Sequence, residues 1–120
     1  MEGKDTQVRD LNNGHKMPVF GLGTFSLKES DLIYKSISEY GYRMLDCASY
    51  YKNEEIVGEA LNRCFSDSGP VKREELFIIS KIWVDEVYDV EAACRRSLEK
   101  LGLEYLDLYL IHWPVAMASS

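Results

Sequence analysis

Three apolar runs in this chain each lead into a polar residue that could take part in chemistry. The run Met44–Asp46 ends in an acid, Phe77–Lys81 ends in a lysine, and Leu106–His112 ends in a histidine. A tyrosine, Tyr51, follows the acid five residues later. A lysine cation beside a tyrosine hydroxyl stabilises the phenolate, which makes a tyrosine usable as a proton donor near neutral pH.

The four residues suit the reduction of a carbonyl group. Asp46 would hold Lys81 charged and oriented, and Tyr51 would then give a proton. His112 could donate a hydrogen bond to a substrate carbonyl oxygen and share the charge that develops there. No side chain supplies hydride, so a cofactor must do so. Metal-dependent hydrolysis is poorly supported, because the sequence has two histidines and no Cys or His pair with ligand spacing.

Each residue also has a structural interpretation. Asp46 could cap loop amides, Lys81 could be solvated, and His112 could be a hydrogen-bonded core residue. Tyr51 could serve packing alone. Lys81 could instead form an imine with a carbonyl substrate, but an ion pair with Asp46 would keep the amine protonated and disfavour this. The joint placement of the polar residues at strand ends favours their common role in carbonyl reduction.

Alternating strands and helices would position these residues. We expect a β-hairpin over Gln7–Met17 with pairing stopped at Pro18, followed by strands at 19–25, 42–46, 76–81 and 106–112. Parallel strands joined by right-handed crossovers present their carboxyl ends at one rim, where ligands bind in barrels and open sheets alike. The acid, the lysine and the histidine should therefore share that rim.

Three amphipathic helices should fill the intervals between the strands. The first has Ser30 as its N-cap, the second has Asn53, and the third has Asp89 and closes at Gly102. The expected buried residues, helix by helix, are Leu32, Ile33, Ile37 and Tyr40; Ile56, Val57, Ala60, Leu61, Cys64 and Phe65; and Val90, Cys94, Ser97, Leu98 and Leu101.

Composition excludes several classes of protein. With 46% hydrophobic and 28% charged residues the chain is globular rather than disordered. A net charge of −6 leaves no broad basic field for nucleic acid or an anionic membrane. Three widely spaced cysteines indicate reduced thiols in the cytoplasm. The N-terminus lacks an apolar secretion segment, and no apolar run approaches the roughly 18 residues of a membrane span.

Five motifs along the chain, taken in order, belong to one known family. They are Leu-Asn-Asn-Gly-His-Lys-Met-Pro, Gly-Leu-Gly-Thr-Phe, Leu-Asp-Cys-Ala-Ser-Tyr-Tyr-Lys-Asn-Glu, Ile-Ser-Lys-Ile-Trp and Leu-Asp-Leu-Tyr-Leu-Ile-His-Trp-Pro. From about Gln7 to Pro114 the sequence resembles the aldo-keto reductases, α/β proteins with a (β/α)8 TIM barrel that reduce aldehydes and ketones with NADPH.

The resemblance implies a site residue by residue. It implies a catalytic tetrad with a tyrosine proton donor, made of Asp46, Tyr51, Lys81 and His112. NADPH or NADP would lie beside Gly23, Thr24, Phe25, Asp46 and Lys81. A pocket for a small carbonyl substrate would be lined by Phe25, Tyr50, Trp83 and His112. The hairpin would plug the amino-terminal end of the barrel.

Length sets the expected domain organisation. A full barrel takes about 250 residues, whereas this chain of 120 supplies a hairpin, about four strands and three helices. We expect a flexible N-terminus over 1–6 and a partial aldo-keto reductase domain over 7–120. The expected function is NADPH-dependent reduction of an aldehyde or ketone to an alcohol. The alternative is an inactive truncated product or an interaction module, with self-association through the exposed half-barrel edge.

Overall fold

An antiparallel hairpin opens the part of the chain that the computed structural model describes, residues 7–118. The segment 1–6, expected to be flexible, lies outside the described residues. The hairpin consists of β1 (Val8–Asp10) and β2 (Lys16–Pro18). Pairing was predicted to stop at Pro18, but Pro18 pairs with Val8. Pro18 has no N–H to donate, but the next residue, Val19, donates its N–H to the Gln7 carbonyl at 3.0 Å, so the pairing continues past the proline.

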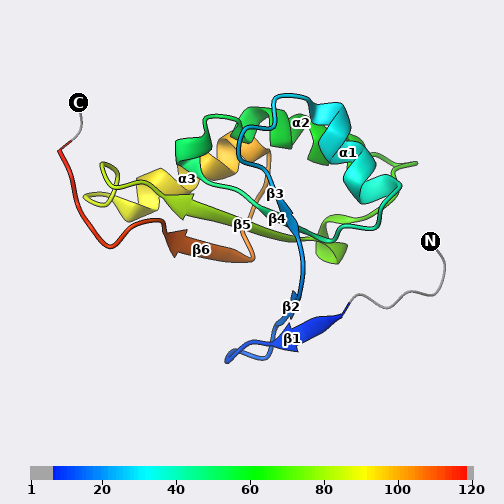
Figure 1. Cartoon of the computed structure of the whole chain (residues 1–120), viewed down its shortest axis with the longest axis horizontal. Coiled ribbons are helices and arrows are strands. Elements are labelled where there is room, and N and C mark those ends of the chain that lie inside the picture. The colour runs from blue at the N-terminus through cyan, green and yellow to red at the C-terminus, as the bar shows by residue number, and fades with distance from the viewer. Residues whose placement is uncertain (1–6, 119–120) are drawn as a thin grey trace.

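A four-stranded parallel sheet forms the centre of the molecule (Figure 1). Its strands are β3 (Leu22–Gly23), β4 (Met44–Asp46), β5 (Phe77–Ile82) and β6 (Leu108–Ile111). The strands lie side by side in chain order, and every pairing among them is parallel. This is the arrangement that successive βαβ units produce.

The first parallel strand is shorter than predicted. The sequence predicted a strand over 19–25, but only Leu22 and Gly23 pair with β4. Val19 and Phe20 are exposed, because this stretch connects the hairpin to the sheet without running beside another strand (Figure 1). An apolar run therefore gave the right position for β3 but the wrong length.

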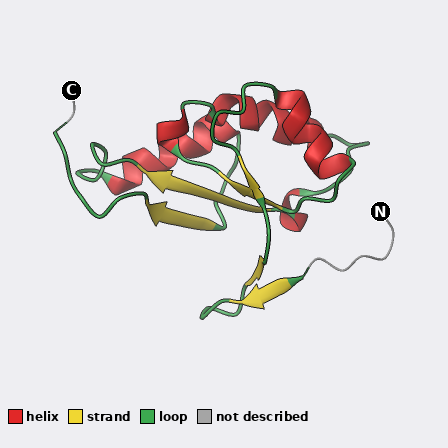
Figure 2. Ribbon diagram, viewed as in Figure 1, coloured by secondary structure: helices red, strands yellow, loops and turns green. Residues whose placement is uncertain are grey.

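Three α-helices cover one face of the sheet (Figure 2). They are α1 (Ser30–Ser38), α2 (Glu54–Cys64) and α3 (Val90–Leu101). Two short 3-10 helices, η1 (Ser49–Tyr51) and η2 (Arg73–Glu75), lie in the connections. None of the helices among residues 7–118 combines the length and the hydropathy that crossing a bilayer requires.

The predicted N-cap positions are confirmed at Asp89 and Asn53 and wrong at Ser30. Asp89 caps α3 by accepting a hydrogen bond from the Ala92 N–H at 3.1 Å, and Gly102 ends that helix with φ of +68°. Ser30 is instead the first residue of α1. Asn53 precedes α2 as predicted, but its side chain makes no hydrogen bond to the helix.

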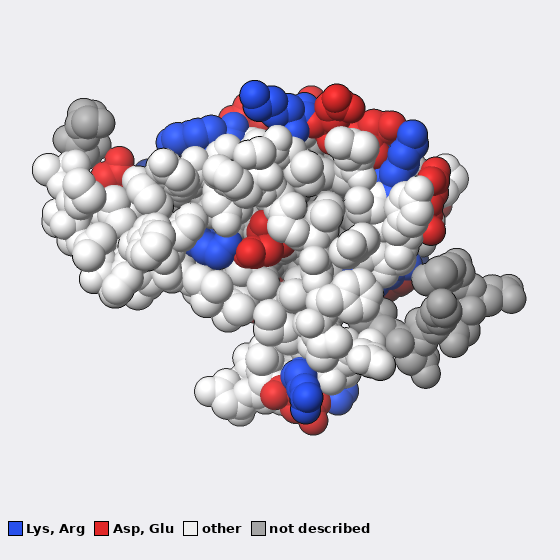
Figure 3. Space-filling model, in the orientation of Figure 1, with Lys and Arg blue, Asp and Glu red and all other residues white. Residues whose placement is uncertain are grey.

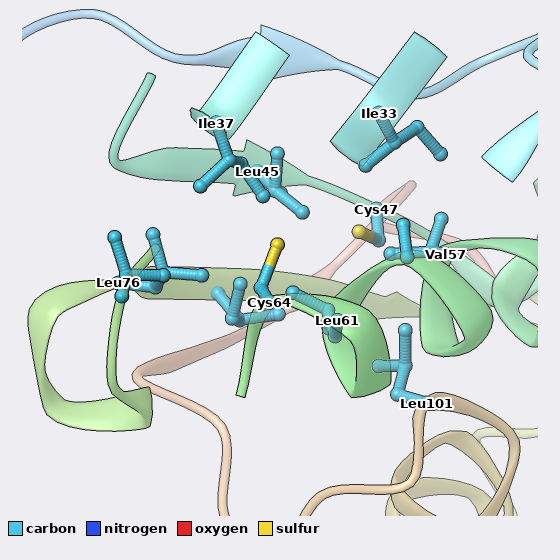
Figure 4. Packing of buried hydrophobic residues seen from close by; sticks show 12 residues of the cluster. Ile33, Ile37, Leu45, Cys47, Val57, Leu61, Cys64, Leu76 and Leu101 are labelled. Atoms are coloured by element: carbon cyan, nitrogen blue, oxygen red, sulfur yellow. The ribbon is translucent and has the colours of Figure 1, made fainter. Parts of the chain in front are cut away.

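The core lies between the helices and the sheet (Figure 4). Its largest fully buried apolar side chains are Ile33, Ile37, Leu45, Leu61, Ile78, Leu101 and Val57. They come from all three helices and from the two central strands β4 and β5. The helical periodicity therefore predicted most of this core.

The predicted helix faces are wrong at their margins. Leu32 is exposed because α1 is buried only through Ile33 and Ile37, and Tyr40, also exposed, lies beyond the end of α1. Val90 is also exposed, since it occupies the first position of α3. On α3 the buried residues are Ala93, Ser97 and Leu101, whereas Cys94 and Leu98 are only partly buried.

A second, smaller apolar cluster lies on the other face of the sheet. Met44 and Phe77, the first residues of β4 and β5, pack with Ile79, and the hairpin residues Leu11 and Met17 pack against them. The hairpin therefore sits at the amino-terminal ends of the central strands. The opposite, carboxyl-terminal rim carries the predicted site.

Candidate active site

Three neighbouring strands bring the predicted acid, lysine and histidine to one rim. Asp46 is the last residue of β4, Lys81 is the penultimate residue of β5, and His112 directly follows β6. Asp46 pairs with Ile79 in the sheet. Because side chains alternate along a strand, Lys81 lies on the same face as Ile79, one pleat closer to the rim. The parallel register thus places the lysine beside the acid.

The Lys81 ammonium contacts three acceptors. Its Nζ donates to Asp46 Oδ1 at 2.5 Å, to the Cys47 carbonyl at 3.0 Å and to the Tyr51 hydroxyl at 3.3 Å. The Lys81 side chain is 12% exposed and that of Asp46 is 43% exposed. An ammonium has three N–H donors, so each one has a partner. The geometry places this lysine in an ion pair with Asp46 and orients it toward the tyrosine.

Tyr51 ends the 3-10 helix η1, which follows β4 after a two-residue connection. Its ring packs edge-on against Phe25, with 5.1 Å between ring centroids, and against His112 at 5.7 Å. Lys52, with φ of 58°, then turns the chain into α2. The hydroxyl of Tyr51 is therefore held at the lysine, and the ring faces the histidine.

His112 lies among aromatic rings. Its centroid is 5.2 Å from that of Trp83, edge-on, and 6.3 Å from that of Trp113, with nearly parallel planes. Desolvation and, second, the Lys81 cation lower the pKa of His112. A neutral imidazole retains one N–H donor, so the side chain can still donate a hydrogen bond.

An open cavity of about 340 Å³ lies on this rim and has an aromatic lining. The residues that line it are Phe25, Tyr50, Tyr51, Trp83, His112 and Trp113. All four residues predicted for the substrate pocket are in this set. Trp113 was not predicted, although its position immediately after the strand-end histidine was a usable signal. A volume of this size suits a small organic molecule.

The two predicted cofactor contacts at the end of β3 have different surroundings. Gly23 is exposed, and a Cβ at this position would meet no atom within 4 Å, so the space beside it is open. Thr24 is fully buried. Its hydroxyl and its N–H both donate to the Asp46 carbonyl, at 2.9 and 3.1 Å. The Thr24 side chain thus secures the loop against β4, and its contact with a cofactor stays a prediction.

Asn53 is a site residue that the sequence analysis missed. Its Nδ2 donates to the Thr24 carbonyl at 2.6 Å and to the Leu27 carbonyl at 2.9 Å. These bonds tie the start of α2 to the loop after β3. The cap position concealed this role, because asparagine before a helix is ordinarily explained by capping.

Glu54 is a second missed residue, buried between α2, β5 and α3. Its carboxylate accepts hydrogen bonds from the hydroxyls of Ser80 at 2.8 Å and Ser97 at 3.0 Å. Burial raises the pKa of Glu54 above its usual value. Because Ser80 precedes Lys81 in β5, this acid anchors the strand that presents the lysine. A buried acid at the start of a helix leaves no periodic signal.

Comparison with solved structures defines the fold. A Bombyx mori aldo-keto reductase in complex with NADP superimposes with a TM-score of 0.86 at 36% identity, over 97% of this chain and 41% of that chain. The aldose reductase of Schistosoma japonicum gives the same TM-score at 42% identity, over 95% and 39%. These neighbours are (β/α)8 barrels, and the present fold is part of such a barrel, as predicted.

Sequence comparison then defines the family. A model of the Aldo/keto reductase family matches residues 14–119, and the chain belongs to this family. NADP-dependent D-sorbitol-6-phosphate dehydrogenase of Malus domestica is 50% identical over 107 residues, which are 88% of this chain and 34% of that protein. Glycerol 2-dehydrogenase (NADP(+)) of Saccharomyces cerevisiae is 44% identical over 115 residues, 93% and 35%. The chain spans about a third of the length of these relatives.

Proposed function

We propose that this site reduces an aldehyde or ketone to an alcohol, with NADPH as the hydride donor. The observation that carries the proposal is the Lys81 ammonium, which contacts both the Asp46 carboxylate and the Tyr51 hydroxyl beside an aromatic cavity. Relatives named for NADP-dependent dehydrogenation support it. When bound, NADPH supplies the hydride that adds to the carbonyl carbon.

The chain's own residues would supply the proton and stabilise charge. Tyr51 gives its hydroxyl proton to the carbonyl oxygen, and the resulting phenolate is stabilised by Lys81. Asp46 keeps Lys81 protonated through their short contact. His112 donates a hydrogen bond to the same carbonyl oxygen as negative charge develops on it. Solvent then returns a proton to Tyr51.

The residues on the rim fit a nicotinamide ring. The open space beside Gly23 adjoins Phe25, whose exposed ring borders the cavity. Gly23, Thr24 and Phe25 would border the cofactor, with Asp46 and Lys81 nearby. A Bombyx mori relative of known structure was solved with NADP, which supports this cofactor.

Imine chemistry at Lys81 has less support from the same geometry. An amine must lose its proton before it attacks a carbonyl group. All three N–H donors of Lys81 are engaged by acceptors, one of them a carboxylate. These contacts favour the protonated amine, so Lys81 acts on Tyr51 rather than on the substrate.

Substitution of Tyr51 by Phe tests the proton-donor role. Tyr51→Phe keeps the ring but removes the acid, so we expect the rate of NADPH-dependent reduction of a simple aldehyde to fall about 100-fold or more. The loss of NADPH absorbance measures this rate. Tyr40→Phe, which removes the hydroxyl of an exposed tyrosine outside the cavity, is the matched control. Activity retained in Tyr51→Phe would rule out the assignment.

A second candidate function is that of a non-catalytic interaction module. One observation favours it: within residues 7–118, β6 pairs on one side only and carries exposed apolar side chains. Titration of the 120-residue chain with NADPH, followed by tryptophan fluorescence, separates the two functions. Saturable micromolar binding supports the reductase, and no binding supports the module.

A further inference from the structure

One carboxylate joins the two segments that carry the wall of the cavity. Glu86 lies in the connection between β5 and α3. Its Oε1 accepts hydrogen bonds from the Ser49 hydroxyl at 2.6 Å and from the Trp83 N–H at 3.1 Å. Its Oε2 accepts from Arg96 Nη2 on α3 at 3.2 Å. A single side chain therefore ties together η1, the loop after β5 and the helix α3.

The residues held by this carboxylate adjoin a pair of stacked rings. Tyr50 is the neighbour of Ser49 in η1, and its ring stacks on that of Trp83 with 3.8 Å between centroids and 25° between planes. Both rings line the aromatic cavity. The hydrogen bonds of Glu86 thus reach the side chain of Ser49, next to Tyr50, and the backbone N–H of Trp83 itself.

The negative charge of Glu86 strengthens the hydrogen bonds that its carboxylate accepts. Its side chain is 19% exposed, and partial desolvation by itself would raise the pKa of Glu86. Hydrogen bonds from Ser49, Trp83 and Arg96 outweigh desolvation, and the pKa lies below its ordinary value. The side chain is thus a carboxylate near neutral pH, and hydrogen bonds to an ionised acceptor are stronger than those between neutral groups.

A separate contact holds the rest of the loop. Val84 is buried, and its carbonyl accepts a hydrogen bond from the Met117 N–H at 2.9 Å. This contact does not involve Glu86. The Glu86 N–H also donates to the Trp83 carbonyl at 3.1 Å, and this backbone bond does not need the carboxylate. Loss of the Glu86 carboxylate should therefore remove the tie between Trp83, Ser49 and Arg96 while the turn and the fold persist.

We propose that Glu86 is a positioning residue that clamps Tyr50 against Trp83 and thereby sets which carbonyl substrates the cavity accepts. This inference rests on the proposed function, because selectivity requires that a carbonyl compound binds in the cavity. A substrate with an aromatic group large enough to touch both rings depends on the clamp. A short aliphatic aldehyde does not.

Fluorescence of Trp83 tests the clamp without a substrate. The sequence has two tryptophans, so every variant carries Trp113→Phe to leave Trp83 as the sole reporter. Glu86→Ala removes the hydrogen bonds that the carboxylate accepts. We therefore expect the population of conformations in which Trp83 is unstacked from Tyr50 to rise about tenfold. Acrylamide quenching should increase accordingly. Glu86→Gln, which keeps an acceptor oxygen, should restore most of the protection.

Two further variants complete the quenching experiment. Glu91→Ala removes an exposed acid of α3 that pairs only with Arg95, and its quenching should equal that of the parent. Ser49→Ala removes one of the three hydrogen bonds and should increase quenching less than Glu86→Ala does. Quenching unchanged in a folded Glu86→Ala protein overturns the clamp. If Glu86→Ala does not fold, unchanged quenching in Ser49→Ala overturns it instead.

Kinetics test the selectivity in a protein that retains Trp113. Glu86→Ala should raise KM for an aromatic aldehyde by a factor that is about ten times the factor for a short aliphatic aldehyde. The change in kcat for the aromatic aldehyde should be smaller than the change in its KM. Equal changes for both substrates overturn the selectivity role. Absence of reduction in the unsubstituted protein would instead refute the proposed function, while the quenching of Trp83 would still decide whether the clamp exists.

Discussion

At the scale of single residues, the candidate site is held by side chains that bond to backbone carbonyls of neighbouring segments. Thr24 donates to the Asp46 carbonyl, Lys81 donates to that of Cys47, and Asn53 donates to that of Thr24. Each bond joins two segments that meet at the carboxyl-terminal rim of the sheet. These side chains therefore fix the main chain around the candidate site.

Asn53→Asp should destabilise the protein even though aspartate is a good helix N-cap. The substitution removes the two N–H donors that reach the Thr24 and Leu27 carbonyls and places a charge against those oxygens. We expect a loss of about 1–3 kcal/mol in the free energy of unfolding, measured by urea titration. Asn62→Asp, at an exposed position of the same helix, is the control. Equal stability of Asn53→Asp and the parent would contradict this role.

Glu54 should make stability depend on pH. Because burial raises the pKa of Glu54 above 4.5, the folded state binds a proton more tightly than the unfolded state. The stabilisation is thus present below pH 4.5 and is lost as pH rises through the raised pKa. Relative to Glu54→Gln, the parent should lose up to about 1.4 kcal/mol per pH unit in this window.

Urea titrations of both proteins across this pH range measure the difference in unfolding free energy. Glu59→Gln, which removes an exposed glutamate from the same helix, controls for loss of a charge without burial. A stability difference between the parent and Glu54→Gln that stays constant, or that grows in favour of the parent as pH rises, would refute the prediction.

Spacing and residue type predicted the members of the candidate tetrad, because each is at or near a strand end and parallel strands end together. Glu86, Asn53 and Glu54 were not predicted. The partners of Asn53 and Glu54 lie 26 or more residues away along the chain, and Ser49 lies 37 residues from Glu86. A polar residue in a turn or cap already has a local explanation, so the sequence gives no reason to look for a distant partner. Their roles required the three-dimensional structure.

At the scale of elements, α2 and α3 approach each other closely at Gly58. A Cβ built there would lie 2.5 Å from the Lys100 carbonyl oxygen and 3.1 Å from that of Leu101. Both atoms belong to the backbone at the end of α3, which cannot move aside as a side chain can. The helix thus accepts a glycine in its interior so that the two helices can pack.

Gly58→Ala should therefore reduce stability although alanine favours helix formation by about 1 kcal/mol. Overpacking against backbone typically costs about 1–3 kcal/mol, so we expect a net loss, measured as a lower midpoint of thermal unfolding. Gly23→Ala, where the added methyl group meets no atom within 4 Å, is the control and should change the midpoint little. A midpoint raised in Gly58→Ala would mean that the helices separate at low cost.

The order and type of elements were predictable, but their ends were less so. Apolar periodicity located all three helices, and continuous apolar runs located β4, β5 and β6. The apolar run at 19–25 contains a strand of only two residues. Pairing with β4, rather than the extent of the apolar run, sets the ends of this strand. Tertiary packing likewise decided that Leu32 and Tyr40 remain exposed.

At the scale of the whole molecule, charged side chains are unevenly distributed over the face that Figure 3 shows. Charged side chains gather over the helices and on the hairpin, while the surface between them is mostly uncharged (Figure 3). Within residues 7–118, β3 and β6 each pair on one side only. The last residue of β6, Ile111, is 70% exposed. The sheet therefore has apolar side chains and unpaired backbone groups at the same edge.

The 120-residue chain should associate with itself through this edge. Because unpaired strands and exposed apolar side chains promote association, we expect sedimentation velocity to show larger species as concentration rises. Ile111→Lys should shift the distribution toward the monomer. Val90→Lys, at an exposed aliphatic residue on α3, is the matched control and should not. Equal behaviour of the two variants would place any association elsewhere.

The whole candidate tetrad lies in one continuous stretch of sequence, from β4 to the residue after β6. A gene segment that encodes this stretch would carry the acid, the tyrosine, the lysine and the histidine as one inherited block. The same stretch carries Tyr50 and Trp83, so under the proposed function the proton-donating group and much of the cavity wall would be inherited together.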